Sequence, residues 1–346
     1  MFRADKARAE ARKVLGEVAT GHDPQGERVA ARNAPREHSL RAMIDLYLAD
    51  RKQVIRPGTL RASKQYLAGP YFQPLHKMQI DQITRADVAS CLTKITNSNG
   101  RIPAAGARTK LSAFFVWAMQ RGMVERNPVL GTFKPGGGQS RERVLDDTEI
   151  AAIWRECGNS DYGRVVRLLL LTGCRRMEVG GMKWSELNLA TGSWTISEDR
   201  TKNGRAHTLP LPPMAMEIVR SKLPPLLGRN HLFGEYGTRG FSAWSPNKAA
   251  IDAKLGDQVK PWTIHDFRRT AATKMADIGI QPHIIEAILN HVSGHKGGIA
   301  GIYNRSSYAA ETKTALLRWS EYLSKVVAER ASNVLAFPAT SEISAL

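Results

Sequence analysis

WTIHDFRRTAATKMADIGIQPHIIEAILNHVSGHKGGIAGIYNR, residues 262–305, is the stretch that decides the interpretation of this chain. His265 and Arg268 stand three residues apart at the start of a helical pattern, so their side chains share one helix face. His291 follows a second helical run, and Tyr303 lies further along the stretch. Tyr303 is a candidate nucleophile, His265 and His291 are candidate proton carriers, and Arg268 is a candidate anion-binding group.

The length and composition indicate a soluble protein of several domains. The chain has 346 residues, which allows two or three domains, and 42% of them are hydrophobic. It has no apolar run long enough to span a membrane, and its charged, alanine-rich start does not match a signal peptide. Cys91, Cys157 and Cys174 match neither a disulfide framework nor a zinc-site spacing. We therefore expect a cytoplasmic protein with no membrane partner and reduced thiols.

The chain is strongly basic, and the charge is unevenly distributed. The net charge is +18, and residues 37–140 carry 15 basic and 6 acidic residues, whereas residues 141–346 carry 27 and 21. Such an excess of positive charge favours a polyanionic partner, with nucleic acid as the first candidate. A basic surface that is solvated and binds nothing is the alternative.

The first part of the chain has helical patterns only. Residues 1–36 contain the helix-forming run DKARAEARKVLGEVATG and are too short for a domain, so we interpret them as an N-terminal helix and linker. Residues 37–130 read as a helical domain, and within it Thr84 is a candidate N-cap because an aspartate stands three residues later. Phe114, Phe115 and Trp117 lie in an apolar helical run and are expected in the core.

Residues 131–143, GTFKPGGGQSRER, read as a linker, because three consecutive glycines and a proline interrupt any regular element. Arg141 and Arg143 add positive charge there. A hinged clamp around a rod-shaped ligand would need such a segment, but an ordinary linker between two domains explains it equally well.

Residues 144–330 combine helices with a pair of short strands. SWTIS and AHTLPL flank Lys202-Asn203-Gly204, and Asn-Gly between such runs is a hairpin signal, so Lys202 is expected at or beside the turn. Arg175 opens a short helical run. Further helices are expected at 213–222, 244–255, 263–278, 282–291 and 308–330, and the tail 331–346 is expected to be flexible. The predicted fold class is mainly α with a small antiparallel β-sheet (α+β).

Five motifs in one order give the chain its resemblance to the tyrosine recombinase (phage integrase) family. They are LTGCRRMEV, TKNGRAHTLPL, HDFRRTAAT, LNH and AGIYNR. The resemblance covers residues 141–330, and the wording WSEL, TKNGR and GIYNR is most similar to integrases of genomic islands and P4-type prophages. By the same resemblance, residues 37–130 are the core-DNA-binding domain, residues 144–330 the catalytic domain, and residues 1–36 a remnant of an arm-binding domain.

The resemblance implies a site-specific DNA recombinase that acts through a 3′-phosphotyrosyl intermediate. Its catalytic residues would be Arg175, Lys202, His265, Arg268, His291 and the nucleophile Tyr303. The arginines would hold the phosphate, Lys202 would protonate the leaving oxygen, His265 would take the tyrosine proton and His291 would bond the phosphate. Glu178 would orient these groups, and no cofactor, ATP or metal is implied. Tyr308 is a rival nucleophile.

Several other polar residues have two interpretations. The candidate DNA contacts are Arg141, Arg143, Arg205, His207 and Arg269, of which His207 is structural or a phosphate contact and Arg269 is solvated or faces DNA. Asp266 is expected to support a helix start. His283, His291 and His295 could suggest a metal site, but no carboxylate or cysteine cluster joins them at ligand spacing.

The family also implies partners. Two domains would close around double-stranded DNA, and a homotetramer would pair two sites, helped by an accessory DNA-bending protein and an excisionase. The C-terminal helix would dock on a neighbouring subunit, or else it packs on its own domain. A catalytically silent DNA-binding protein and a type IB topoisomerase-like enzyme are the alternative functions.

Overall fold

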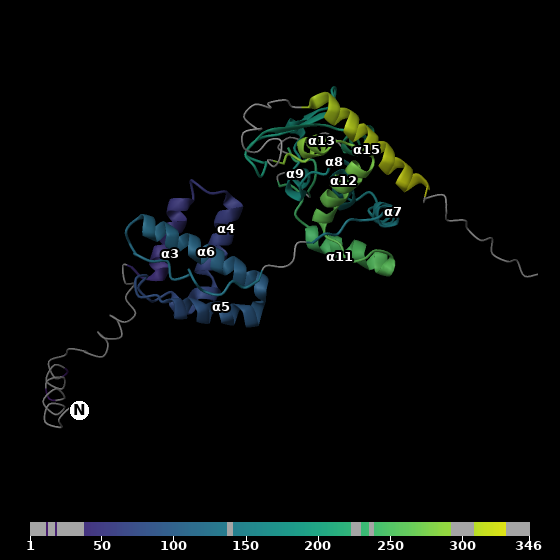
Figure 1. Cartoon of the computed structure of the whole chain (residues 1–346). Helices are drawn as coiled ribbons and strands as arrows, with labels where there is room; N and C mark the ends of the chain where they lie inside the picture. The colour runs from purple at the N-terminus through teal and green to yellow at the C-terminus, as the bar shows by residue number, and fades with distance from the viewer. Residues whose placement is uncertain are drawn as a thin grey trace, which may run out of the picture. The chain divides into compact units, whose positions relative to one another are not determined.

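The structure is a computed structural model. It describes residues 38–136, 141–222, 230–234, 239–291 and 308–329, together with Arg12 and Val18. The chain divides into two compact units, Met1–Ser140 and Arg141–Leu346 (Figure 1). The predicted tail 331–346, most of residues 1–36, and the side chains of His295 and Tyr303 lie outside the described residues.

The regular elements of the first unit's described part are all helices, apart from one isolated β-bridge between Ser39 and Gln79. Its elements are α3 (Leu40–Arg51), α4 (Pro57–Ala68), the 3-10 turn η1 (Pro70–Leu75), α5 (Arg85–Asn99) and α6 (Arg101–Gln120). Local sequence explains where α5 begins. Thr84 Oγ1 accepts the Asp87 N–H at 3.3 Å, and the Asp87 carboxylate accepts the Thr84 N–H at 2.9 Å. This reciprocal cap satisfies two backbone donors that the first turn leaves unpaired.

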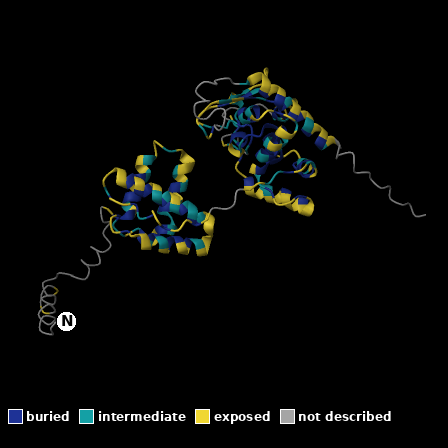
Figure 2. Cartoon of the chain, in the orientation of Figure 1, coloured by how far each residue is buried: buried dark blue, intermediate teal, exposed yellow. Residues whose placement is uncertain are grey.

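The core of this unit gathers around the apolar face of α6. Phe114, Phe115 and Trp117 are all buried, which confirms their expected place in the core. Figure 2 shows buried and exposed positions alternating along the helices of this unit. The Trp117 indole N–H donates to the Asp50 carboxylate at 3.0 Å, so the ring is buried without leaving its polar atom unpaired. This contact ties α6 to the end of α3.

The second unit is larger and contains the only β-strands in the described part of the chain. Its helices are α7 (Asp147–Glu156), α8 (Asp161–Thr172), α9 (Arg176–Gly180), α10 (Pro213–Arg220), α11 (Trp244–Leu255), α12 (Ile264–Asp277), α13 (Pro282–Ile288) and α15 (Ala309–Glu329), with 3-10 turns η2 (Trp184–Glu186) and η3 (Gly256–Gln258). Most residues of α8 are buried, so this helix runs through the core, where α12 packs along it.

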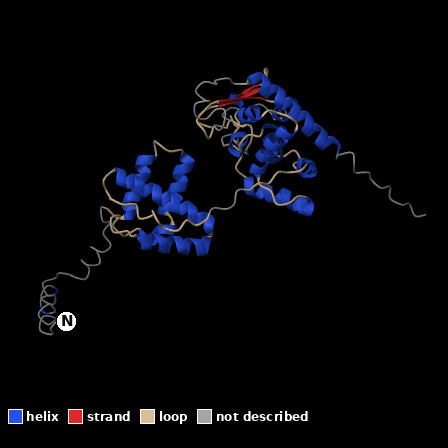
Figure 3. Ribbon diagram, in the orientation of Figure 1, coloured by secondary structure: helices blue, strands red, loops and turns tan. Residues whose placement is uncertain are grey.

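A small antiparallel sheet lies beside these helices (Figure 3). Its strands are β1 (Leu187–Asn188), β2 (Ser193–Ile196) and β3 (His207–Pro210), in the order β1-β2-β3. Ser193 pairs with Pro210 and Ile196 with His207. The predicted α+β fold class is confirmed. The link between β2 and β3, residues 197–206, is longer than the tight turn that Asn203-Gly204 signals.

The helix α15 packs on its own unit. Ala315, Leu316, Trp319 and Leu323 are buried in the same core as α8, and the Trp319 indole N–H donates to Leu170 O at 2.9 Å. The sequence left two alternatives for the C-terminal helix, docking on a neighbouring subunit or packing on its own domain. In this structure, residues 309–329 pack on their own unit.

Other sequence expectations can be compared with the structure directly. Trp262 is buried, and all three cysteines are free and buried. The helix expected at 282–291 ends earlier, because Asn290 adopts a left-handed conformation with φ 48°. Within the described ranges, no helix combines the length and apolar character that crossing a membrane requires.

Candidate active site

Arg175 lies in the bend that joins α8 to α9. Gly173 ends α8 with φ 63°, a left-handed conformation that favours glycine. Glu178 is buried, and its carboxylate accepts both the Arg175 N–H at 2.8 Å and Arg175 Nη1 at 2.9 Å. The Arg175 side chain keeps 22% of its surface exposed. Glu178 therefore holds Arg175 from the buried side while part of the side chain faces solvent.

Arg268 has its guanidinium buried between two chain ends. From α12, its Nη1 donates to Gly173 O at 2.8 Å and its Nη2 donates to Leu289 O at 2.6 Å. These bonds bring the end of α8 and the end of α13 to one point. Burial, together with the charge of nearby Arg175, lowers the pKa of Arg268 to about 10, so the side chain stays charged at neutral pH. Two guanidinium groups far apart in the sequence thus share one electrostatic environment.

Two imidazoles belong to the same environment. Burial, followed by the charges of Arg269 and Arg268, lowers the pKa of His265 below its ordinary value of 6.5. Burial and the charges of Arg268 and Arg175 likewise lower the pKa of His291. Both imidazoles are therefore mainly neutral at pH 7, and each has a nitrogen lone pair that can accept a proton or a hydrogen bond.

Asp266, between these groups in the sequence, has a supporting place. It is fully buried, and its carboxylate accepts the Thr263 N–H at 2.7 Å, which caps α12 and confirms the expected role at the helix start. The same carboxylate accepts Arg269 Nη1 at 2.6 Å and lies 3.8 Å from Arg141 Nη2. The positive charges of Arg269 and Arg141 are therefore partly neutralised by the Asp266 carboxylate.

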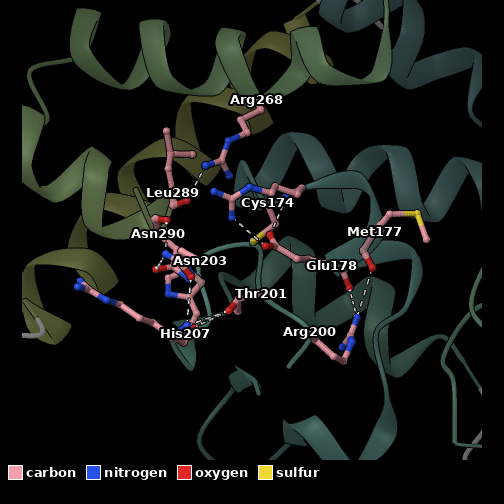
Figure 4. A network of polar contacts seen from close by, with 12 residues as sticks. Cys174, Met177, Glu178, Arg200, Thr201, Asn203, His207, Arg268, Leu289 and Asn290 are labelled. Atoms are coloured by element: carbon pink, nitrogen blue, oxygen red, sulfur yellow. Dashed lines mark hydrogen bonds and ion pairs between the residues drawn. The ribbon is translucent and has the colours of Figure 1, made fainter. Parts of the chain in front are cut away.

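The loop 197–206 packs against the end of α13. Asn203 Nδ2 donates to Asn290 O at 3.0 Å and Asn290 Oδ1 at 2.9 Å (Figure 4). His207 Nε2 lies 3.0 Å from Ile288 O, and because a carbonyl only accepts, this nitrogen carries the proton. Lys202, on the same loop, is exposed. Lys202 is thus on a loop that contacts Asn290, just before His291.

A cavity of about 530 Å³ lies beside His291. Arg205 and Lys313 contribute positively charged groups to its wall, and His207 and His291 contribute imidazoles. Basic side chains around a hollow attract anions.

The remaining predicted residues are distributed as follows. Arg143 forms an ion pair with the buried Glu149, so its positive charge is also partly neutralised within the protein. Arg205 is exposed. Tyr303, the predicted nucleophile, lies outside the described residues. Tyr308, its rival, packs its ring against that of His283 with centroids 5.0 Å apart. His283 stands at the start of α13, the opposite end from His291.

The arrangement can hold a phosphate. Two guanidinium groups can hold non-bridging phosphate oxygens in a fork, and neutral imidazoles can move protons beside them. Within the part of the chain that the structure describes, no group of three histidine, cysteine or acidic residues could hold a metal.

The sequence interpretation missed three residues that organise this region: Arg200, Asn203 and Asn290. Asn203 was counted only as a turn residue. One signal could have found Asn290, since an asparagine just after a helix pattern is a common left-handed C-terminal residue. Arg200 had no local signal, because its partners Glu178 and Glu186 lie on other elements.

Comparisons with known proteins agree on one family. The model described as Phage integrase family matches residues 143–309, and the model described as Phage integrase central domain matches residues 40–132. The chain is similar to Prophage integrase IntZ of Escherichia coli (strain K12), at 26% identity over 73% of this chain and 63% of that protein. Prophage integrase IntA of the same organism is 30% identical over 44% of this chain and 36% of its own length.

The chain therefore spans less than two thirds of the length of these two curated relatives. Among solved structures, a lambda integrase tetramer bound to a Holliday junction matches with a TM-score of 0.61 and 20% identity, covering 86% of this chain and 90% of that one. This likeness shows a shared fold.

Proposed function

Since the chain belongs to the tyrosine recombinase (phage integrase) family, we propose that it is a site-specific DNA recombinase that integrates or excises a mobile element. It would cut and rejoin DNA through a 3′-phosphotyrosyl intermediate. The observation that carries this proposal is the buried Arg268 guanidinium, whose hydrogen bonds join the chain segments that bear Arg175 and His291.

The main cost of the reaction is electrostatic. Ionising a phenol of pKa about 10 at pH 7 costs about 4 kcal/mol. The transition state also places additional negative charge on the non-bridging phosphate oxygens. Arg175 and Arg268 would stabilise that charge, and one preorganised donor of this kind contributes roughly 3–4 kcal/mol. Glu178 keeps Arg175 oriented and lowers the entropy lost when the phosphate binds.

The proton transfers follow the roles that the family resemblance implies for the basic groups. Tyr303 would attack the phosphorus and pass its proton to neutral His265. Lys202 would give a proton to the 5′ oxygen as the P–O5′ bond breaks, and His291 would hydrogen-bond the phosphate. The new phosphotyrosyl bond retains the energy of the broken phosphodiester, so rejoining needs neither ATP nor a metal ion.

The partner would be double-stranded DNA in the cytoplasm. Residues 37–130 would act as the core-DNA-binding domain, and with residues 144–330 would close around the duplex through the 131–143 linker. Arg205 borders the basic cavity and is the better supported DNA contact. His207 also borders the cavity, but its Nε2 proton is donated to Ile288 O, which favours the structural interpretation of this residue. Arg141, Arg143 and Arg269 have intramolecular acidic partners, so their contribution to DNA affinity would be smaller.

Assembly would follow the solved relative, a tetramer bound to a Holliday junction. Four protomers would pair two sites. An accessory DNA-bending protein and an excisionase would set the direction of the reaction.

Trapping on a nicked duplex tests the proposal. Short duplexes that tile the DNA flanking the gene are nicked so that the released fragment diffuses away and the covalent complex accumulates. We expect a complex that survives denaturing electrophoresis, is lost in Tyr303→Phe and persists in Tyr308→Phe. Absence of any covalent complex would favour a silent DNA-binding protein. Covalent complexes without exchange between two paired sites would favour a topoisomerase-like enzyme.

A further inference from the structure

The end of α13 is a meeting point for side chains from three other elements. The three successive carbonyls before His291 each accept one hydrogen bond: Ile288 O from His207 of β3, Leu289 O from Arg268 of α12, and Asn290 O from Asn203 of the β2–β3 loop. The last carbonyls of a helix have no partner within the helix. Here each carbonyl holds a different part of the site, and Figure 4 shows the contacts of Leu289 with Arg268 and of Asn290 with Asn203.

The contact made by Asn203 is the most specific of the three. Its amide N–H₂ reaches both the backbone and the side-chain oxygen of Asn290, at 3.0 and 2.9 Å, and the Asn290 amide lies 3.4 Å from Asn203 Oδ1 in return. Asn290 is held at φ 48°, a conformation that few residues other than glycine adopt. The two asparagines therefore form an amide pair whose geometry depends on this backbone bend.

The part of the β2–β3 loop that precedes Lys202 is also fixed by contacts. Arg200 Nη2 donates to Glu178 O at 2.7 Å in α9, and its Nη1 pairs with Glu186. Thr201 is fully buried, and its hydroxyl both donates to Arg205 O at 2.8 Å and accepts the Arg205 N–H at 3.1 Å. The exposed Lys202 thus lies between Arg200, which is bonded to α9, and Asn203, which is bonded to Asn290 beside His291.

We propose that Asn203 is a positioning residue, whose amide pair with Asn290 docks the β2–β3 loop and so places Lys202 to protonate the leaving 5′ oxygen. This inference rests on the proposed function. In the step concerned, the Tyr303 oxygen forms its bond to phosphorus, the P–O5′ bond breaks with its electron pair on O5′, and the proton of Lys202 Nζ moves to that oxygen.

The chemistry of the leaving group separates positioning from a general role in folding. If sulfur replaces the bridging 5′ oxygen, the leaving group is a thiolate, which can depart without being protonated because thiols, with pKa values of about 8.5, are far more acidic than alcohols. Such a substrate does not need the lysine proton. A defect in placing Lys202 disappears on the sulfur substrate, whereas a defect in the phosphate-binding arginines or in folding persists.

The experiment compares Asn203→Ala with wild type on matched nicked duplexes, one with a 5′-bridging oxygen and one with a 5′-bridging sulfur, under single-turnover conditions. The loss of one amide pair should slow covalent-complex formation about tenfold on the oxygen substrate, as for the loss of one hydrogen bond. The sulfur substrate should restore the rate to within about twofold of wild type, as it should for Lys202→Ala.

Two variants control this result. Asn247→Ala removes a similar amide contact, to Ala243 O at 2.7 Å in α11, and should cleave both substrates at the wild-type rate. Asn290→Gly keeps the backbone carbonyl, removes the side-chain oxygen and suits φ 48°, so it should fold and show a smaller, sulfur-rescued defect than Asn203→Ala. It also tests the inference if Asn203→Ala does not fold.

Equal slowing of Asn203→Ala on both substrates, or no slowing on either, would overturn the positioning role while leaving the proposed function intact. A wild-type protein that forms no covalent complex with either substrate would overturn the proposed function and this inference with it. The two failures are therefore distinguished by the wild-type lanes.

Discussion

Arg268→Lys tests how the buried guanidinium divides its hydrogen bonds. A guanidinium has five N–H donors in a planar fork, and here one from Nη1 and one from Nη2 bind Gly173 O and Leu289 O at 2.8 and 2.6 Å. The remaining donors are available to a phosphate. A lysine ammonium keeps the charge, but its single nitrogen cannot span both carbonyls and a phosphate.

The expected loss follows from these contacts. Cleavage should slow roughly 10²–10³-fold, which corresponds to about 3–4 kcal/mol for one preorganised donor. The free energy of unfolding should fall by about 2 kcal/mol, because bonds from a charged donor to two buried carbonyls weaken. DNA affinity should change little, since the positive charge remains.

The assay is single-turnover formation of the covalent complex, with urea unfolding and DNA binding measured on the same protein. Arg318→Lys is the matched control, because Arg318 also donates to a backbone carbonyl, Ile278 O, but from an exposed position on α15. A cleavage rate for Arg268→Lys within about threefold of wild type, in a protein of unchanged stability, would refute the reasoning.

Three further results are expected. The pKa values of His265 and His291 both lie below 6.5. Each imidazole therefore becomes protonated, and loses its ability to accept a proton, only when the pH falls through its lowered pKa. Cleavage should decline on the acid side with a midpoint below 6.5, the decline should be altered in His265→Ala, and a midpoint above 6.5 would contradict this reasoning. Trp319→Ala should lower the free energy of unfolding by about 3–5 kcal/mol at every protein concentration, because its fully buried ring packs within one chain; a concentration-dependent effect in urea titrations would indicate docking on a neighbour. Arg205→Ala should make the slope of log affinity against log salt about 0.9 less steep, and an unchanged slope would remove Arg205 from the DNA contacts.

Local patterns predicted the helices well, because the signals act over a few residues. The Thr84 cap depends on an aspartate three residues away, and the apolar spacing of Phe114, Phe115 and Trp117 defines a single buried face. The helix ending at Ile288 was predicted too long. A periodic apolar pattern does not register the positive φ at Asn290, which is favoured by the contacts this residue makes elsewhere in the fold.

The site depended on a different kind of information. No spacing rule brings Arg268 to the bend before Arg175, since that approach is set by two backbone carbonyls from separate helices. The order of the motifs, through their family resemblance, suggested the set. The Asn203-Gly204 signal predicted the strand pair but not the longer loop, because the Asn203 side chain binds Asn290 and Thr201 holds the loop from within.

Identifying the residue that carries the DNA tests the central claim most directly. The covalent complex formed on the nicked duplex is digested with protease and nuclease, and the modified peptide is sequenced by mass spectrometry. The account predicts a nucleotide remnant on Tyr303, linked through a 3′ phosphate. A remnant on Tyr308, or on any residue other than tyrosine, would contradict it.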